Sequence, residues 1–210
     1  MYITDKDYFI KSIYVPNIEE HNSEASVELE ASIDRYSRQF LKITLNNVLF
    51  SDLDSYITDG VLQLGAPQKW LNLVNGCDYT ISGNTYTWKG LIQTEGLFKE
   101  SILADYVYLN HYQTEANTMT GQVILEAKNG MHISPTAHLV TIWNEFVEKY
   151  QGSTCSQPKQ YFHNGILFTD YYGNRASGYV SYLQFLTDNK EDYLDFAAPQ
   201  LAYKNSFGLL

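Results

Sequence analysis

Apolar residues recur at three- and four-residue intervals between residues 24 and 47, and this pattern predicts the first helix of the chain. Ser23 suits the N-cap position, and Glu24 follows in the first turn, where the helix dipole favours an anion. The apolar stripe consists of Leu29, Ile33, Tyr36, Phe40 and Ile43 or Leu45. This spacing predicts a helix of about six turns from Glu24 to Asn47.

Five further helices are predicted from the same kind of spacing and from capping residues. Pro67 suits the first turn of a short helix that ends at Asn75-Gly76, and Ser134-Pro135 begins a helix that Gly152 ends. The other three predicted helices are Asp52 to Thr58, a long helix through Leu91, Phe98, Ile102, Tyr106 and Leu109 with Gly96 as its weak point, and Ser177 to Asp188.

The apolar period changes to two over residues 77–89, which predicts a β-hairpin around the turn Ser82-Gly83-Asn84. Two strands alone are marginally stable, so this hairpin is expected to lie against helices or another chain. Residues 114–134 have no helical period and suggest a second hairpin or an extended arm with a turn at Asn129-Gly130. A further short strand is predicted around residues 161–168.

These elements predict a mostly α-helical α+β fold with small β-hairpins. We divide the chain into an N-terminal extension (1–22), a main domain (23–192) and a C-terminal tail (193–210). The main domain includes the arm 114–134 and a polar loop, 151–176.

Composition favours protein contact over catalysis. The chain has 210 residues, of which 44% are apolar and 18% charged, so it can form its own core. Fourteen basic against 24 acidic residues give a net charge of −10, which argues against tight binding of a nucleic-acid backbone. The 18 tyrosines combine an apolar ring with a polar tip, which suits surfaces that become buried when a partner binds.

The ends of the sequence and its cysteines indicate a reducing compartment. The N-terminal residues lack the basic and apolar regions of a signal peptide, and no stretch approaches 18 uncharged apolar residues. We therefore expect synthesis in a cytoplasm and no membrane partner. Cys77 and Cys155 are interpreted as free thiols, with a disulfide between them as the alternative.

Residue patterns typical of catalytic, metal or cofactor sites do not occur in the sequence. The five histidines include no pair at helical spacing, and the glycines form no phosphate-binding loop. The chain has no Gly-x-Ser-x-Gly motif, and carboxylate pairs such as Asp52 and Asp54 are expected on solvated faces. The sequence therefore predicts no enzyme activity, no metal and no cofactor.

The aromatic residues divide into core candidates and contact candidates. Tyr36, Phe40, Trp70, Trp143 and Phe146 lie on helical stripes and are expected in the core. The tyrosines at positions 106, 108, 112, 171, 172, 179 and 182 occupy several faces of their elements, so some of these rings are expected to meet another chain.

The run Phe207-Gly208-Leu209-Leu210 is expected to dock on a neighbouring chain, because exposed apolar residues on a free tail promote aggregation. The predicted partner-contact residues come from the arm, the loop and the tail. They are Gln122, Val123, Ile124, Leu125, Met131, Tyr171, Tyr172, Tyr203, Phe207, Leu209 and Leu210.

Several aromatic and glycine motifs occur together in the chain. They are Trp70-Leu71-Asn72-x-x-Asn75-Gly76-Cys77-x-Tyr79, Trp88-x-Gly90-Leu91, a Tyr-rich segment (Tyr106, Tyr108, Tyr112), Thr118 to Gly121, Trp143 and Asn205-x-Phe207-Gly208. Over roughly residues 65–210, this set resembles a family of head-to-tail adaptor, or neck ring, proteins from tailed phages of Bacteroides-type hosts, including crAss-like phages. The predicted helix from Glu24 to Asn47 agrees with the expected first helix of that family.

The resemblance implies a helical-bundle adaptor fold with extended arms and a C-terminal tail, assembled as a dodecameric ring below the portal. It implies a structural virion protein with no catalysis and no cofactor. The implied partners are other copies of the chain, the portal protein and the next neck or tail ring protein, and DNA only passes through the ring. Ring closure uses heterologous contacts, which the arm 114–134 and the tail 193–210 could supply while ordering only on assembly.

The negative charge has a role in such a ring, because acidic channel walls repel DNA phosphates. Two other classes remain open as alternatives. One is a secreted or tail-associated, Tyr-rich carbohydrate- or receptor-binding module, which would also expose aromatic rings. The other is an acidic DNA mimic that inhibits a DNA-binding protein, although here the carboxylates are scattered among cations.

Overall fold

The structure is a computed structural model that describes residues 2–18, 23–95, 98–118, 127–128, 131–132, 135–152, 160–163, 166–169 and 178–204. Within these residues the chain has an α+β fold with five α-helices and five antiparallel strand pairs. The helices are α1 (Glu24–Asp54), α2 (Gln68–Asn75), α3 (Ile102–Thr118), α4 (Pro135–Gln151) and α5 (Tyr182–Asp188). Two short 3-10 helices, Lys6–Tyr8 and Lys11–Ile13, precede α1.

Each of the five sheets contains two strands that are consecutive in the sequence. The pairs are β1 (Ile57–Thr58) with β2 (Val61–Leu62), β3 (Cys77–Ile81) with β4 (Asn84–Trp88), β5 (Ile92–Glu95) with β6 (Phe98–Ser101), β7 (Ala127–Lys128) with β8 (Met131–His132), and β9 (Gln160–His163) with β10 (Ile166–Thr169).

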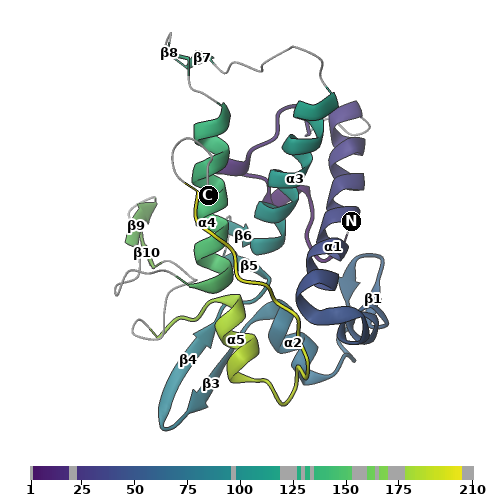
Figure 1. Cartoon of the computed structure of the whole chain (residues 1–210), viewed down its shortest axis with the longest axis vertical. Helices are drawn as coiled ribbons and strands as arrows, with labels where there is room; N and C mark the ends of the chain where they lie inside the picture. The colour runs from purple at the N-terminus through teal and green to yellow at the C-terminus, as the bar shows by residue number, and fades with distance from the viewer. Residues whose placement is uncertain are drawn as a thin grey trace.

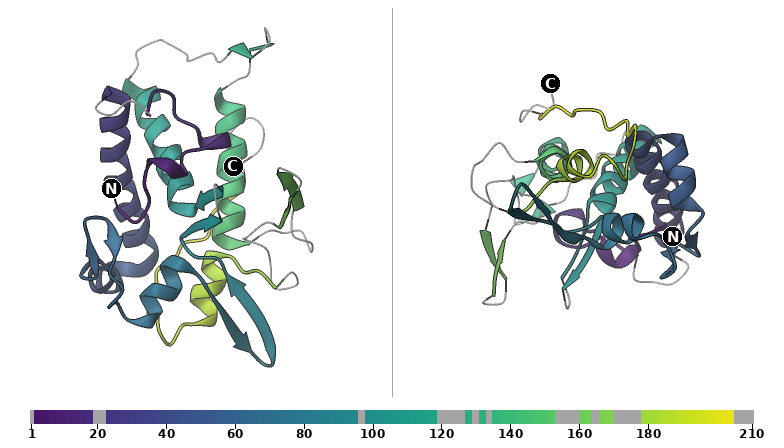
Figure 2. Two further views of the ribbon diagram at one scale, coloured as in Figure 1. Left: turned by 180° about the vertical axis from the view of Figure 1, so that it is seen from behind. Right: turned by 90° about the horizontal axis from the view of Figure 1, so that it is seen from below.

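Helix α3 lies between α1 and α4, so the three long helices form one layer of the molecule (Figure 1). The short helices α2 and α5 and the hairpin β3–β4 lie at one end of this layer, while β7–β8 lies beyond the other end (Figure 1). Residues 2–18 cross α3 on the face opposite to the C-terminal segment (Figure 2).

The larger of the two core clusters is centred on Phe40 of α1. Its ring centroid lies 5.2 Å from that of Tyr106, 5.5 Å from that of Tyr182, and 6.0 Å from those of Phe146 and Tyr150. Residues from α1, α3, α4 and α5 therefore meet at one aromatic centre, where tilted and edge-on ring pairs add to the burial of apolar area.

The second core cluster is formed between α1, α3 and the N-terminal segment. Tyr8, Phe9, Ile13, Val15 and Ile18 are buried there. They pack with Leu29, Ile33 and Tyr36 of α1 and with Ala104, Val107 and Tyr108 of α3. Residues 2–18 thus contribute to the core, and the division of the chain at residue 22 stays a prediction.

Helix α1 bends sharply at Asn46, whose backbone (φ 64°, ψ 170°) lies in the region that favours glycine. The Asn46 side chain caps the second half of the helix, because its Oδ1 accepts hydrogen bonds from the N–H groups of Val48 and Leu49 at 2.8 and 3.0 Å. Helix α1 begins at Glu24 as predicted but continues past the predicted end at Asn47 to Asp54. The predicted helix from Asp52 to Thr58 is wrong, because helix resumes at once after Asn46 and ends at Asp54.

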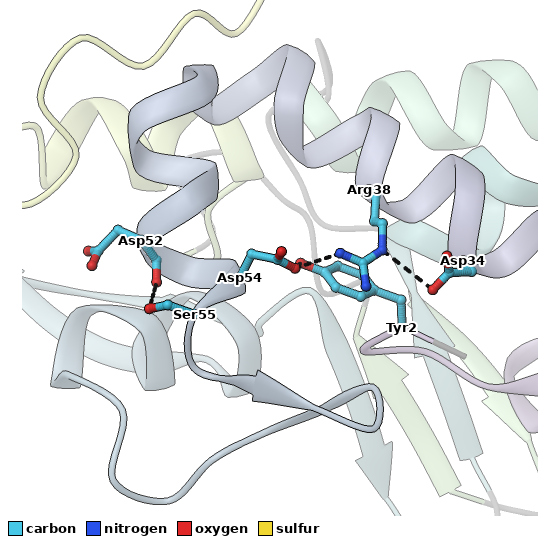
Figure 3. Close-up of polar contacts among 6 residues, drawn as sticks. All are labelled: Tyr2, Asp34, Arg38, Asp52, Asp54 and Ser55. Atoms are coloured by element: carbon cyan, nitrogen blue, oxygen red, sulfur yellow. Dashed lines mark hydrogen bonds and ion pairs between the residues drawn. The ribbon is translucent and has the colours of Figure 1, made fainter.

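The bend brings Arg38 next to Asp54. In a straight helix, residues 16 positions apart are separated by about 24 Å along the axis, yet Arg38 Nη1 lies 2.6 Å from Asp54 Oδ1 (Figure 3). The guanidinium also covers the ring of Tyr2 at 4.1 Å, and the Tyr2 hydroxyl donates to Asp54 at 2.9 Å. These contacts join the two halves of α1 to the N-terminal segment.

The predicted long helix from Leu91 to Leu109 is wrong in its first half. Strands β5 and β6 occupy residues 92–95 and 98–101, and α3 begins at Ile102. Ser101 determines the start, because its Oγ accepts from the N–H groups of Leu103 and Ala104 and donates to the carbonyl of Leu91. The apolar residues before it fit a helical spacing by chance.

The other predicted elements agree with the structure more closely. The hairpin 77–89 and the helices ending at Gly76 and Gly152 are confirmed. Helix α5 begins at Tyr182, later than the predicted Ser177, because Ser181 is its N-cap. Residues 114–118 of the predicted arm belong to α3, and the strand predicted around residues 161–168 is the hairpin β9–β10.

Candidate protein–protein interface

Most of the predicted partner-contact residues lie outside the described residues. These are Gln122, Val123, Ile124, Leu125, Tyr171, Tyr172, Phe207, Leu209 and Leu210. Met131 begins strand β8, beyond the ends of α3 and α4 (Figure 1). Tyr203 lies in the C-terminal segment, is half-buried, and donates its hydroxyl to the carbonyl of Gly152 at 3.2 Å. Whether these residues contact a partner stays a prediction.

The C-terminal segment 198–204 runs along α4 without helix or strand of its own (Figure 1). The Gln151 side chain binds both backbone groups of Leu201, at 2.8 and 2.9 Å. Asn144 binds both backbone groups of Lys204 in the same way, each at 2.9 Å. Trp143 Nε1 donates to the carbonyl of Ala202 at 2.8 Å. We expected the tail to order only on assembly, but residues 198–204 dock within one chain.

Tyr193 fixes the start of this tail in the core. Its ring packs 5.8 Å from that of Trp70 and 5.7 Å from that of Phe185, and its hydroxyl donates to the carbonyl of Lys69 at 2.6 Å. Further along, Asn46 donates to the carbonyl of Asp195, and the N–H of Ala197 donates to the carbonyl of Thr44. The tail is therefore anchored first in the core and then at the bend of α1.

The four most exposed large apolar side chains among the described residues lie in two parts of the molecule. Leu64, in the loop that follows the hairpin β1–β2, is 96% exposed, and Val61 of the same hairpin is also exposed. Near the bend of α1, Val48 is 78% and Leu194 67% exposed. Apolar side chains held outward by defined backbone are typical of contact with another protein surface.

Two of the seven tyrosines among which we expected some partner contacts are buried in the chain's own core. Tyr108 is 4% and Tyr182 0% exposed. The expectation assumed that one helix cannot bury rings on several faces. These two rings are buried because α3 is covered by α1, by α4 and by residues 2–18, and because the Tyr182 hydroxyl shares a hydrogen bond with the buried Thr44 hydroxyl at 2.9 Å. Whether others of the seven meet a partner stays a prediction.

The hairpin β3–β4 extends from the body and has one edge partly covered (Figure 2). On the β4 side, Thr87 bonds Gly178 and Val180 through its backbone. On the β3 side, no backbone hydrogen bond beyond the hairpin is found between Asp78 or Thr80 and any described residue. The Asp78 carboxylate on this edge discourages pairing with a foreign strand, so the hairpin edge is a weaker interface candidate than the exposed apolar residues.

A buried charge cluster joins β6, α3 and α4. Lys149 Nζ lies 2.5 Å from Glu100 Oε1 and 2.7 Å from Asp105 Oδ2. Burial raises the pKa of Asp105 from its ordinary value near 3.8 to about 6, although Lys149 opposes this shift. Burial also lowers the pKa of Lys11, which faces Glu100 and Lys149 from the N-terminal segment. The cluster orients four elements and faces no described cavity.

The described residues show little that suggests catalysis or metal binding. No group of three or more potential metal ligands is found among them. Burial raises the pKa of the Cys77 thiol to about 11, so this cysteine is a poor nucleophile at neutral pH. No described helix is long and apolar enough to cross a membrane.

A cleft of about 370 Å³ lies where the N-terminal segment meets α2, β4 and β5. It is lined by Tyr8, Asn75, Trp88, Lys89, Ile92, Gln93 and Thr94. The Tyr8 and Thr94 hydroxyls share a hydrogen bond of 3.1 Å, and the Trp88 ring stacks on Phe185 at 5.3 Å. The largest aromatic ring at the cleft is therefore already packed inside the protein.

Searches against models of protein families, against curated proteins and against solved structures return no match to this chain.

Proposed function

We propose that this chain is a structural protein that assembles into a ring in the head-to-tail connector of a phage virion, below the portal, and leaves a channel for DNA. The observation that carries the assembly role is the nearly complete exposure of Leu64 in an ordered loop, together with Val48 and Leu194 near the bend of α1. The resemblance of the aromatic and glycine motifs supports the place in the virion.

The two apolar sites belong to different elements, which suits ring formation. A ring uses heterologous contacts, in which one patch on a subunit meets a different patch on the next. The β1–β2 hairpin and the bend of α1 could supply such patches. The net charge of −10 suits a channel through which DNA passes, because carboxylates on its wall would repel the phosphates.

The assembly role can be tested with the purified full-length chain, alone and mixed with the portal protein. Electron microscopy and light scattering are expected to show rings. Leu64→Ser is expected to reduce ring formation without lowering the melting temperature, because the side chain is exposed in the free subunit. Gln63→Ser, in the same loop, is the matched control. A chain that stays monomeric at high concentration and with the portal would contradict the proposal, and a basic ring channel would contradict the role of the acidic residues.

The carbohydrate-binding alternative has one structural observation in its favour, the cleft beside Tyr8. The amides of Asn75 and Gln93 could bind sugar hydroxyls there. Sugar binding also uses open aromatic faces, and the ring of Trp88 is stacked on Phe185 and packed beside Tyr182. A glycan array probed with the full-length chain separates the two functions, and the ring proposal predicts no glycan binding.

A further inference from the structure

The groove along α4 recognises the backbone of the C-terminal segment. Asn144 and Gln151 each bind the N–H and the C=O of one residue, and Trp143 Nε1 binds a third carbonyl. In antiparallel sheets, the N–H and C=O of one residue bond both backbone groups of the residue opposite in a similar way. The two side-chain amides therefore act as substitutes for a neighbouring strand.

The spacing of the two amides matches an extended chain. Asn144 and Gln151 are seven residues apart, which is about 10.5 Å along a helix. The residues that they bind, Lys204 and Leu201, are three apart, which is about 10 Å in an extended chain. The helix thus presents two amide groups at the repeat of an extended peptide that runs antiparallel to it.

The connection to this segment, residues 198–200, is short and has no hydrogen bond to the described residues. The last anchor before the groove is the bond from the N–H of Ala197 to Thr44, and the first bond in the groove is at Leu201. Between them, Pro199 and Gln200 are exposed, and the structure shows no hydrogen bond from either to the described residues. Pro199 also restricts Ala198 to extended conformations, and Ala198 is half-buried against the core cluster.

From these contacts we propose that the α4 groove is an interface at which each copy of this chain receives residues 201–204 of a neighbouring copy in exchange for its own. The groove binds backbone groups, so the same segment of a second copy satisfies Asn144, Gln151 and Trp143 equally well. Because the contacts are the same in both arrangements, exchange changes the free energy little, and this is the usual route to domain-swapped assemblies. The three-residue connection spans about 10 Å, so the second copy must lie directly beside the first.

Exchange rests on the proposed ring for its biological role, since neighbouring ring subunits are held at this short distance. Its test is independent of the virion. If rings form and no exchange is detected, the exchange inference is wrong and the ring proposal stands. If exchange is detected and no rings form, the ring proposal is wrong and the exchange inference stands.

The test uses cross-linking between two full-length variants, in both of which Cys77 and Cys155 are replaced by serine. One variant carries Gln151→Cys and an affinity tag, and the other carries Leu201→Cys without a tag. The two are mixed at high concentration, incubated and treated with a short bis-maleimide. As a positive control, a single chain that carries both Gln151→Cys and Leu201→Cys is treated in the same way. Its internal cross-link shows that the reagent can join the two positions. A tagged Val27→Cys variant, with its cysteine at an exposed site on α1, replaces the Gln151→Cys variant as the control for random collisions.

Exchange predicts a cross-linked heterodimer from the Gln151→Cys and Leu201→Cys mixture, at least tenfold more abundant than from the control mixture. The tagged variant already lacks the Gln151 amide, so addition of Asn144→Ala removes the second groove amide as well and is expected to lower the heterodimer yield. If the double-cysteine chain is joined internally while the mixture gives no heterodimer above the control, the segment stays in its own groove and the inference is wrong.

Discussion

Gly76 and Gly90 face each other across a backbone contact that allows no side chain on either residue. A Cβ atom on Gly76 would lie 2.5 Å from the carbonyl oxygen of Trp88, and one on Gly90 would lie 2.5 Å from that of Val74. Both glycines also have positive φ angles, 86° and 95°. The end of α2 and the end of β4 are thus held together at the two glycines of the sequence motifs.

We expect Gly76→Ala and Gly90→Ala each to lower the free energy of unfolding by about 3 kcal/mol or more, because backbone atoms must move in addition to the strain at positive φ. Chemical denaturation measures the loss. Gly83→Ala, where φ is 82° and no atom lies within 4 Å of the added Cβ, isolates the strain and should cost about 1–2 kcal/mol. Equal losses at all three positions would show that the close contact has no energetic role.

Asn46 is expected to stabilise the bend of α1 through its side chain. Asn46→Ala removes the cap of Val48 and Leu49 and the bond to Asp195, and keeps a Cβ at positive φ, so it should cost about 2 kcal/mol. Asn46→Gly loses the same bonds but relieves the backbone strain, and should cost clearly less. Thermal denaturation of the two variants measures this difference. A glycine variant less stable than the alanine variant would contradict the assigned backbone conformation.

Asp105 should make the folded state less stable as pH rises from about 4 to about 6. Its pKa in the folded chain is raised to about 6 by burial, so the folded state holds this proton more tightly than the unfolded state does. The contribution is fully present below pH 3.8 and is lost as pH rises through 6. With about 1.4 kcal/mol for each unit of pKa difference, it amounts to about 3 kcal/mol.

The Asp105→Asn variant removes this titration, so the difference in unfolding free energy between the two proteins should change with pH over that window, in favour of the variant at the higher pH. Urea denaturation at a series of pH values measures the difference. A difference that is constant with pH would show that Asp105 keeps an ordinary pKa.

Tyr193→Ala tests whether the C-terminal tail belongs to the core. The ring is 1% exposed between Trp70 and Phe185, so its removal should cost about 3–5 kcal/mol. Leu194→Ala changes the adjacent but exposed residue and should alter stability by less than about 0.5 kcal/mol. The two melting temperatures provide the comparison. Equal melting temperatures would mean that residues 193–204 do not pack as described.

Local patterns in the sequence predicted those elements that have their own end signals. The hairpin 77–89 and the helix that begins at Pro135 follow from alternation, turn residues and caps. The start of α3 was missed because Ser101, a capping serine, lies inside an apolar spacing that also fits a helix. The first helix was predicted to end at Asn47, next to the bend at Asn46, but the continuation of α1 to Asp54 and the cap by Asn46 were missed, although two consecutive asparagines mark that position in the sequence.

The candidate interface could be predicted only in part. The tail was expected to contact a protein surface, but its docking on α4 depends on amides that are distant in sequence, and polar residues on a helix carry no signal for such a role. Leu64 and Val48 were missed as exposed residues, since exposure depends on packing. The burial of Tyr108 and Tyr182 likewise depends on residues 2–18 and α1, which no local pattern connects to them.

Because Tyr193 lies in the core, the core of this protein cannot be completed until the C-terminal part of the chain has been made. The chain is made from its N-terminus at about 5–20 residues per second, so α1 and Trp70 leave the ribosome many seconds before the tyrosine that completes their packing. During that interval the apolar faces of α1 and α2 are not fully covered, and once α4 is made its groove has no tail to bind. Only completed copies therefore have the closed core around Tyr193 and the tail in the α4 groove.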